Sequence, residues 1–327
     1  MHQYDIRDLR IHFPTRRGVV EAVRGVSFYM DQGECVALVG ESGCGKSVTA
    51  RSLMGLTEVT GGRCQPGSQI LCHGENILDY GKKQWQSYRG REAAMIFQDA
   101  MTSLNPTMQI GHQIAECYRF HQKIGRKEAL EKAAEMLALV GISDPETALR
   151  RYPHEFSGGM RQRVMIASAL ACQPGLLIAD EPTTALDVTI QAQILDLLRN
   201  LKNKINSSIM LITHDLGVIA EMADYVVVMY AGRVVEKGTV EEIFANPAHP
   251  YTIGLMASKP VVGKKVDKLY SIPGKVPNPI NMPDYCYFKD RCEMQVEKCS
   301  GEYPHMIQLS PTHMVSCYRY FDGKVGE

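Results

Sequence analysis

The octet Gly40-Glu41-Ser42-Gly43-Cys44-Gly45-Lys46-Ser47 constrains the fold of this 327-residue chain more than any other feature. It follows the apolar run ECVALV and leads into VTARSLMGL, which has the composition of a helix. The glycines let the backbone curl, so that successive N–H groups and the start of the helix point at phosphate oxygens. The octet therefore predicts a strand, a phosphate-binding loop and a helix in succession, within an α/β protein.

The side chains of this loop suit a nucleotide and a magnesium ion. Lys46 is predicted to neutralise the β- and γ-phosphates, and Ser47 to ligate Mg²⁺. The alternative is a Gly-rich strand-to-helix turn without a ligand, but average composition makes a chance match to the whole octet rare. The residues predicted to bind nucleotide here are Gly40, Ser42, Gly43, Cys44, Gly45, Lys46, Ser47 and Val48.

A second chemical signal lies at the end of the apolar run LLIAD, where two carboxylates follow one another. The carboxyl ends of strands carry the ligands in α/β sheets. Asp180 is predicted to coordinate magnesium through bound water, and Glu181 to act as the general base on a water that attacks the γ-phosphate. A solvated acidic strand end is the alternative, which the phosphate-binding loop upstream makes less attractive.

Short apolar runs alternate with helical patterns from residue 34 onward, which indicates strands of a buried parallel sheet. The chain has 36 Lys+Arg and 36 Asp+Glu, and this balance gives no reason to expect a polyanion partner. The predicted strands lie within ECVALVG, AAMIFQD, LLIADEP, SIMLITHD and YVVVMY, and the last of these turns at Ala231-Gly232 into a terminal hairpin.

The character of the sequence changes along the chain, which predicts a division into parts. Residues 5–30 hold two β-rich stretches, as expected of an antiparallel β subdomain. The segment EALEKAAEMLALVG has helical spacing, so an inserted helical subdomain is expected at about 99–160. The sequence then becomes Pro-rich and irregular near its end. The expected domains are therefore 1–245 and a small Cys-containing domain at 246–327.

The expected location is the cytoplasm. No stretch of about 18 uncharged apolar residues occurs, and MHQYDIRDLR lacks the apolar core of a signal peptide. A chain that stays in a reducing compartment keeps its thiols reduced, so clustered cysteines suggest a metal site.

The segment FSGGMRQR at Phe156–Arg163 precedes a helical run and forms a second predicted phosphate site. The Ser157 hydroxyl and the N–H groups of Gly158 and Gly159 suit an anion at a helix start. This segment resembles the signature sequence of ATP-binding-cassette (ABC) proteins, although Met160 stands where the family usually has glutamine. The resemblance implies a P-loop NTPase fold of the ABC nucleotide-binding type, in which each signature closes over ATP held by the opposite subunit.

The same resemblance implies roles for further residues. Gln98 looks like the family's magnesium- and water-contacting glutamine, and His214 looks like the γ-phosphate histidine, so the expected catalytic set is Glu181, His214 and Gln98. Phe13 looks like the aromatic residue that stacks on adenine, although an aromatic in a β stretch is usually core. Ala185-Leu186-Asp187 looks like the loop through which the two subunits touch.

The sequence downstream resembles one branch of the family, the ATPases of oligopeptide and dipeptide importers. The resemblance lies in NPAHPYT at 246–252 and in a Pro-rich tail with four cysteines at C-x5-C-x6-C-x17-C spacing. The spacing departs from the paired C-x2-C of zinc fingers and suits an iron–sulfur cluster of the kind that the resemblance to this branch implies, so a [4Fe–4S] cluster is favoured over zinc. Four free thiols are the alternative. The predicted ligands are Cys286, Cys292, Cys299 and Cys317.

The function implied by the resemblance is that of the ATP-hydrolysing subunit of a di- or oligopeptide importer, at the cytoplasmic face of the membrane. The implied partners are a second, identical or homologous ATPase subunit, two transmembrane permease subunits and, indirectly, an extracytoplasmic peptide-binding protein. An importer of nickel or another small solute is the nearer alternative. A non-transport ABC ATPase acting on DNA or ribosomes is the remote one, because the balanced charge does not favour nucleic acid.

Overall fold

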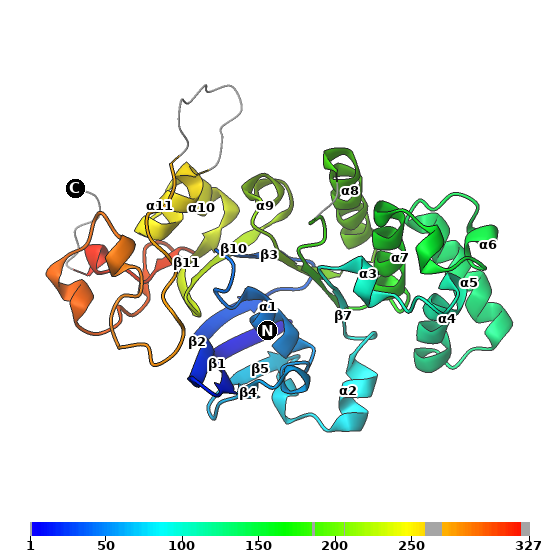
Figure 1. Cartoon of the computed structure of the whole chain (residues 1–327), viewed down its shortest axis with the longest axis horizontal. Helices are drawn as coiled ribbons and strands as arrows, with labels where there is room; N and C mark the ends of the chain where they lie inside the picture. The colour runs from blue at the N-terminus through cyan, green and yellow to red at the C-terminus, as the bar shows by residue number, and fades with distance from the viewer. Residues whose placement is uncertain (1, 185–186, 206, 259–269, 322–327) are drawn as a thin grey trace. The chain divides into compact units, whose positions relative to one another are not determined.

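The computed structural model describes residues 2–184, 187–205, 207–258 and 270–321. The α/β class expected from the sequence is confirmed. The chain, drawn in Figure 1, divides into two compact units. The first consists of the described residues of Met1–Met30, Cys35–Leu78 and Thr213–Glu327, and the second of Asp31–Glu34 and Asp79–Ile212.

An antiparallel sheet begins the first unit, as the sequence predicts. Thr15 of β1 lies opposite Gly18 of β2, and Leu9 lies opposite Val26. Ile6, Leu9 and Ile11 of β1 are buried, because one face of this sheet packs on the interior. The strand order is β2 (Gly18–Met30), β1 (Tyr4–Thr15), β5 (Gln69–Cys72) and β6 (Glu75–Asn76), and β4 (Arg63–Cys64) pairs with β1.

A second set of strands in the first unit carries the phosphate-binding loop. All five residues of β3 (Cys35–Val39) are buried, and β3 runs parallel to β10 (Tyr225–Tyr230). The hairpin predicted at Ala231-Gly232 connects β10 to β11 (Arg233–Thr239), which pairs in turn with β13 (Met314–Val315) and, through it, with β12 (Ile307–Gln308). The helices of this unit are α1 (Lys46–Leu53), α9 (Leu216–Met222), α10 (Val240–Ala245) and α11 (Pro250–Ala257).

The C-terminal segment belongs to the same core as these strands. One apolar cluster contains Val226 and Val228 of β10, Tyr251 of α11 and, from the Cys-containing tail, Tyr287 and Phe288. The helix α10 packs against β10 and β11 (Figure 1). In the described residues 270–321 the regular structure consists of the short 3-10 helices Lys289–Arg291, Glu297–Ser300 and Tyr318–Tyr320 in addition to β12 and β13.

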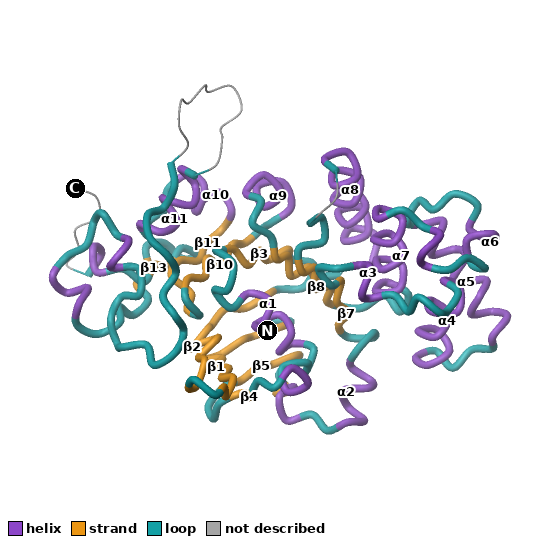
Figure 2. Tube along the Cα trace, viewed as in Figure 1, coloured by secondary structure: helices purple, strands orange, loops and turns teal. Residues whose placement is uncertain are grey.

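The second unit combines three parallel strands with a group of helices. The predicted apolar runs form β7 (Ala93–Ile96), β8 (Leu176–Asp180) and β9 (Ser208–Ile212), with β8 between the other two. The helices α4, α5 and α7 pack against one another (Figure 2). The helices of this unit are α2 (Lys82–Tyr88), α3 (Ala100–Ser103), α4 (Ile110–His121), α5 (Arg126–Leu139), α6 (Pro145–Ala148), α7 (Gly158–Leu170) and α8 (Val188–Ile205).

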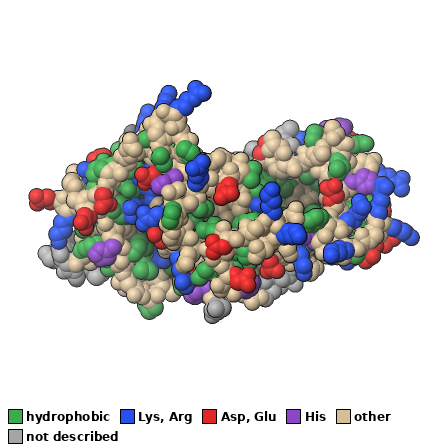
Figure 3. Space-filling model, turned by 90° about the horizontal axis from the view of Figure 1, so that it is seen from below, with side chains coloured by type: hydrophobic (Ala, Val, Ile, Leu, Met, Phe, Trp, Pro, Cys, Tyr) green, Lys and Arg blue, Asp and Glu red, His purple; other side chains and the backbone are tan. Residues whose placement is uncertain are grey.

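Charge is evenly distributed on the visible surface. Basic and acidic side chains are interspersed on the face shown in Figure 3, as the equal numbers of the two kinds suggest. Within the described residues, no helix has both the length and the apolar character needed to span a bilayer.

Candidate functional site

Two glycines of the octet occupy backbone positions that other residues do not tolerate. Gly40 has φ +149°, and a Cβ there would lie 2.2 Å from the carbonyl oxygen of Met229. Gly45 has φ +101°, and its Cβ would lie 2.6 Å from the carbonyl oxygen of Ala22. The curl of the loop between β3 and α1 therefore depends on glycine at both positions.

The loop ends at the start of α1 with a buried lysine. The Lys46 side chain donates to the carbonyl oxygens of Gly40 and Glu41, at 2.7 and 3.0 Å. Lys46 is only 6% exposed. Within the described residues no side chain caps α1 at Gly45, so its first N–H groups suit an anion. Burial raises the pKa of the Cys44 thiol, which stays protonated and contributes packing.

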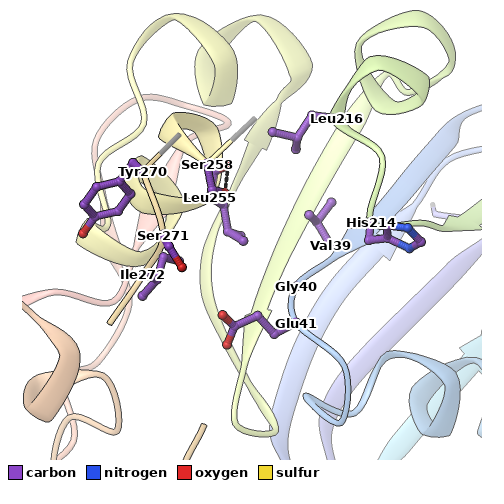
Figure 4. Close-up of a pocket in the computed structure, with 10 residues that line it drawn as sticks. All are labelled: Val39, Gly40, Glu41, His214, Leu216, Leu255, Ser258, Tyr270, Ser271 and Ile272. Carbon is purple, nitrogen blue, oxygen red and sulfur yellow. Dashed lines mark hydrogen bonds between the residues drawn. The ribbon is translucent and has the colours of Figure 1, made fainter. Parts of the chain in front are cut away.

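The other nucleotide-site candidates of the first unit are His214, Phe13 and the remaining residues of the octet. His214 is exposed, and it lines a cavity of about 360 Å³ together with Gly40 and Glu41 (Figure 4). Phe13 lies half-buried on β1, and a Cβ on Gly62 would lie 2.8 Å from its ring. The structure thus brings His214 and the beginning of the loop to one cavity. Ser42 and Gly43 are exposed, whereas Ser47 and Val48 are half-buried.

In the second unit the two carboxylates predicted from LLIAD lie at the end of β8. Asp180 is 2% exposed and Glu181 half-buried. Glu181 has φ +48°, an uncommon conformation for a residue with a side chain, and its N–H donates to the Ile212 carbonyl at 2.9 Å. The Gln98 amide donates to Glu181 Oε2 at 2.9 Å. Two residues predicted to act together, Gln98 and Glu181, are therefore in contact.

Sequence reasoning missed a further contact of Glu181. The Thr184 hydroxyl donates to Glu181 Oε2 at 2.8 Å. The only signal for it is its position three residues after the carboxylate. The neighbouring residues Ala185 and Leu186, predicted to touch a second subunit, lie outside the described residues. Asp187 is described, and its Oδ1 accepts a hydrogen bond from the N–H of Ile190.

The signature-like segment caps a 13-residue helix, α7. Ser157 Oγ accepts from the Met160 N–H at 3.3 Å, and Gly158 opens the helix. A Cβ on Gly159 would lie 2.8 Å from Ile190 Cγ2, so any larger residue there would have to displace the Ile190 side chain. Gln162, which sequence reasoning also missed, is 4% exposed and donates to the Pro182 carbonyl at 2.7 Å. It links α7 to the residue that follows Glu181.

The four cysteines of the tail are not arranged as a metal-binding group in the described part of the chain. All four thiols are free, and no group of three or more His, Cys, Asp or Glu among the described residues is arranged to hold a metal ion. Burial raises the pKa of Cys286 to about 12 and that of Cys317 to about 11, and neighbouring thiols add to both increases. The prediction of a [4Fe–4S] cluster on Cys286, Cys292, Cys299 and Cys317 is therefore not supported, because sequence spacing alone does not fix the directions of the thiols.

A glycine-dependent loop between a buried parallel strand and an uncapped helix, with a buried lysine at its end, defines a class of protein. The class is the P-loop NTPases, which bind nucleotide phosphates at this turn.

The chain belongs to the ABC transporter family, whose model matches residues 23–184. A second model, the C-terminal region of oligopeptide/dipeptide transporters, matches residues 235–299. The expected activity is ATP hydrolysis. The oligopeptide transport ATP-binding protein AppD of Bacillus subtilis (strain 168) is 49% identical over 97% of this chain and 96% of its own length. The dipeptide transport ATP-binding protein DppD of Lactococcus lactis subsp. cremoris (strain MG1363) is 50% identical over 96% of this chain and 90% of its own length.

Solved structures agree on the fold. The cbiO1 protein of Clostridium perfringens, described as part of the ABC transporter complex cbiONQ, has a TM-score of 0.62 at 26% identity, over 75% of this chain and 91% of that one. The dimeric structure of the bacterial ABC transporter cassette MJ0796 has a TM-score of 0.65 at 22% identity, over 72% of this chain and 98% of that one.

Proposed function

We propose that this chain is the ATP-binding and ATP-hydrolysing subunit that powers import of di- or oligopeptides across the cytoplasmic membrane. One observation carries the proposal. Identity of about half to ATP-binding proteins named for oligopeptide and dipeptide transport extends over 96–97% of the chain, including the C-terminal region beyond the nucleotide-binding motifs.

Each site residue has a proposed role in the reaction. Lys46 and the loop N–H groups bind the phosphates, and Glu181 takes a proton from the attacking water. Oxygen donors suit Mg²⁺, so the Ser47 hydroxyl and the Gln98 amide oxygen are proposed ligands, with Asp180 acting through water. His214 contacts the γ-phosphate and Phe13 stacks on adenine. The signature residues Ser157, Gly158 and Gly159 contact the nucleotide of the opposite subunit.

The proposed partners follow from this assignment. A second ATPase subunit, identical or homologous, pairs with this one around ATP, and two permease subunits receive the movement at the cytoplasmic face of the membrane. An extracytoplasmic binding protein selects the peptide, so substrate does not contact this chain.

A transport assay tests the proposal. A strain that lacks the gene is supplied with labelled tripeptide or with labelled Ni²⁺, and uptake is measured with and without the wild-type gene restored. Loss of peptide uptake alone, with recovery on restoration, supports peptide import. Loss of nickel uptake with normal peptide uptake would replace this assignment by nickel import, and copurification with ribosomes or nucleic acid instead of permease subunits would remove transport altogether.

We further propose that the four tail thiols take up a metal centre, of which [4Fe–4S] is favoured. The support is the sequence spacing and the packing of Cys286, Cys292 and Cys299 in one apolar cluster. Binding requires the thiols to turn toward one another and to release protons. The test is anaerobic purification with iron, sulfide and zinc analysis. About four irons per chain supports the cluster, one zinc makes the tail a zinc module, and no metal ends the proposal.

A further inference from the structure

An arginine of the Cys-containing tail contacts the phosphate-binding loop directly. The Arg291 guanidinium donates from both terminal nitrogens to the two carboxylate oxygens of Glu41, at 2.7 and 3.0 Å. The Arg291 side chain is 6% exposed and that of Glu41 is 28% exposed. A bidentate, largely buried ion pair of this kind fixes the orientation of the carboxylate as well as its distance from the guanidinium.

Arg291 is itself held in place by several groups. Its Nε donates to the Pro273 carbonyl at 2.7 Å, and its guanidinium lies 5.7 Å from the ring centre of Tyr230 and 5.8 Å from that of Phe288. Gly274, at φ +75°, allows this approach, because a Cβ there would lie 3.2 Å from Arg291 Cγ. The Arg291 guanidinium therefore has a fixed orientation toward the phosphate-binding loop.

Glu41 is held at its main chain as well as at its side chain. Its N–H donates to the hydroxyl of Tyr251, a fully buried residue of α11, at 2.8 Å. Its carbonyl oxygen accepts from Lys46 Nζ at 3.0 Å. The Cys44 N–H donates to the same carbonyl oxygen at 3.3 Å. The second residue of the octet thus has two attachments from the C-terminal segment and two from within the loop.

The surroundings make these polar contacts important. Glu41 lines the cavity of about 360 Å³, and its carboxylate is drawn beside the segment of Ser271 and Ile272 in Figure 4. Cys44 is buried, but Ser42 and Gly43 are exposed, so the position of the loop depends on hydrogen bonds as well as on packing. Phosphate oxygens compete with the carbonyls of Gly40 and Glu41 for the Lys46 ammonium group. When Lys46 binds phosphate instead of these carbonyls, the hydrogen bonds of Glu41 to Tyr251 and Arg291 still hold the beginning of the loop.

We propose that Arg291 is a positioning residue for ATP binding, which holds the phosphate-binding loop in its receptive curl through Glu41. The inference rests on the proposed binding of ATP at this loop. In this proposal the C-terminal tail helps to hold the nucleotide-binding loop in place.

The experiment compares Arg291→Gln, Arg291→Lys, Glu41→Gln and the double variant Arg291→Gln/Glu41→Gln in the full chain. MgATP affinity is measured by displacement of a fluorescent ATP analogue, and kcat and KM for ATP are measured separately. Asp290→Asn, an exposed neighbour, is the matched control for a changed charge, and Lys46→Ala is the reference for loss of binding.

We expect Arg291→Gln and Glu41→Gln each to raise Kd and KM about three- to tenfold with kcat nearly unchanged, because one partly buried pair is lost in both. The double variant should bind no more weakly than the worse single variant, since both changes break the same contact. Arg291→Lys should recover part of the affinity, and Asp290→Asn should bind like the wild type.

Unchanged affinity in Glu41→Gln, or additive losses in the double variant, would overturn the inference. Glu41→Gln decides even where Arg291→Gln unfolds the tail, because it changes no residue of the tail and its amide oxygen can still accept a hydrogen bond from Arg291. Should Lys46→Ala bind MgATP normally, the proposed function at this loop fails first, and the inference fails with it.

Discussion

Glu181 is the residue at which backbone strain and proposed chemistry coincide. Its φ of +48° costs free energy, and such conformations persist where the surroundings enforce them. Here the enforcing contacts are the hydrogen bond from its N–H to Ile212 and those to its carboxylate from Gln98 and Thr184. The direction of the Glu181 carboxylate is therefore fixed, as a base that positions water requires.

Glu181→Gln is expected to bind MgATP with wild-type affinity and to hydrolyse it at least about 100-fold more slowly, because the phosphate-binding residues stay and the base is lost. Single-turnover hydrolysis, measured beside nucleotide affinity, checks this. Glu146→Gln, an exposed carboxylate of α6, is the control and should turn over normally. Normal turnover in Glu181→Gln would mean that another group takes the proton from the attacking water.

At the scale of elements, α7 and the loop after β8 are joined by Gln162. Its amide donates to the Pro182 carbonyl, and it is 4% exposed. Gln162→Ala is expected to lower the free energy of unfolding by about 1–3 kcal/mol, since a buried carbonyl loses its partner. Turnover should also fall, because Pro182 follows Glu181. Urea unfolding and ATPase assays measure the two effects.

The matched control for that change is Gln193→Ala in α8, where an exposed amide oxygen accepts from Arg163 at 2.9 Å. Water replaces this partner, so stability should change little. Equal changes in the free energy of unfolding for the two substitutions would mean that the burial of Gln162 contributes nothing to stability.

The beginning of α11 carries a pH dependence. Burial lowers the pKa of His249 to about 4, with nearby Glu236 opposing this, and its Nδ1 accepts from the Tyr251 N–H. The unfolded chain has the ordinary value of about 6.5, so the neutral ring stabilises the fold fully above that pH, and this contribution is lost as the pH falls from about 6.5 towards 4.

His249→Asn keeps an acceptor at the helix start and removes the titration. Its unfolding free energy should fall less between pH 7 and pH 5 than that of the wild type, by up to about 1.4 kcal/mol per pH unit. Denaturant titrations at both pH values measure this, with His305→Asn on the exposed surface as the control. An identical pH slope in His249→Asn and the wild type contradicts the prediction.

What the sequence predicts at this scale follows from local physics. Five uninterrupted apolar runs became strands because a buried strand needs apolar residues on both faces. The octet predicted its own curl because only glycine fits at Gly40 and Gly45. The contact between Arg291 and Glu41 joins residues 250 positions apart, and no local pattern announces it. The arrangement of the tail thiols could not be predicted for the same reason, since their spacing in the sequence leaves their directions open.

At the scale of the whole molecule, the expected assembly is a pair of ATPase subunits with ATP between them. Glu181→Gln should accumulate as this pair in MgATP, because ATP stays bound and opening follows hydrolysis. Light scattering after size exclusion should then give twice the 36.4 kDa of one chain, or a pair with a homologous subunit when one is supplied. A monomer in both mixtures would contradict this.

The carboxylate of Glu236 bears on whether the tail is a separable module. It is fully buried on β11 and accepts from the N–H groups of Ala248 and His249, at 2.7 and 2.8 Å, and it hydrogen-bonds His313 at 2.8 Å. All three partners lie beyond residue 245. A gene shortened there would leave a buried charge without these partners, a large penalty. A related chain without this tail must therefore carry a different residue in place of Glu236.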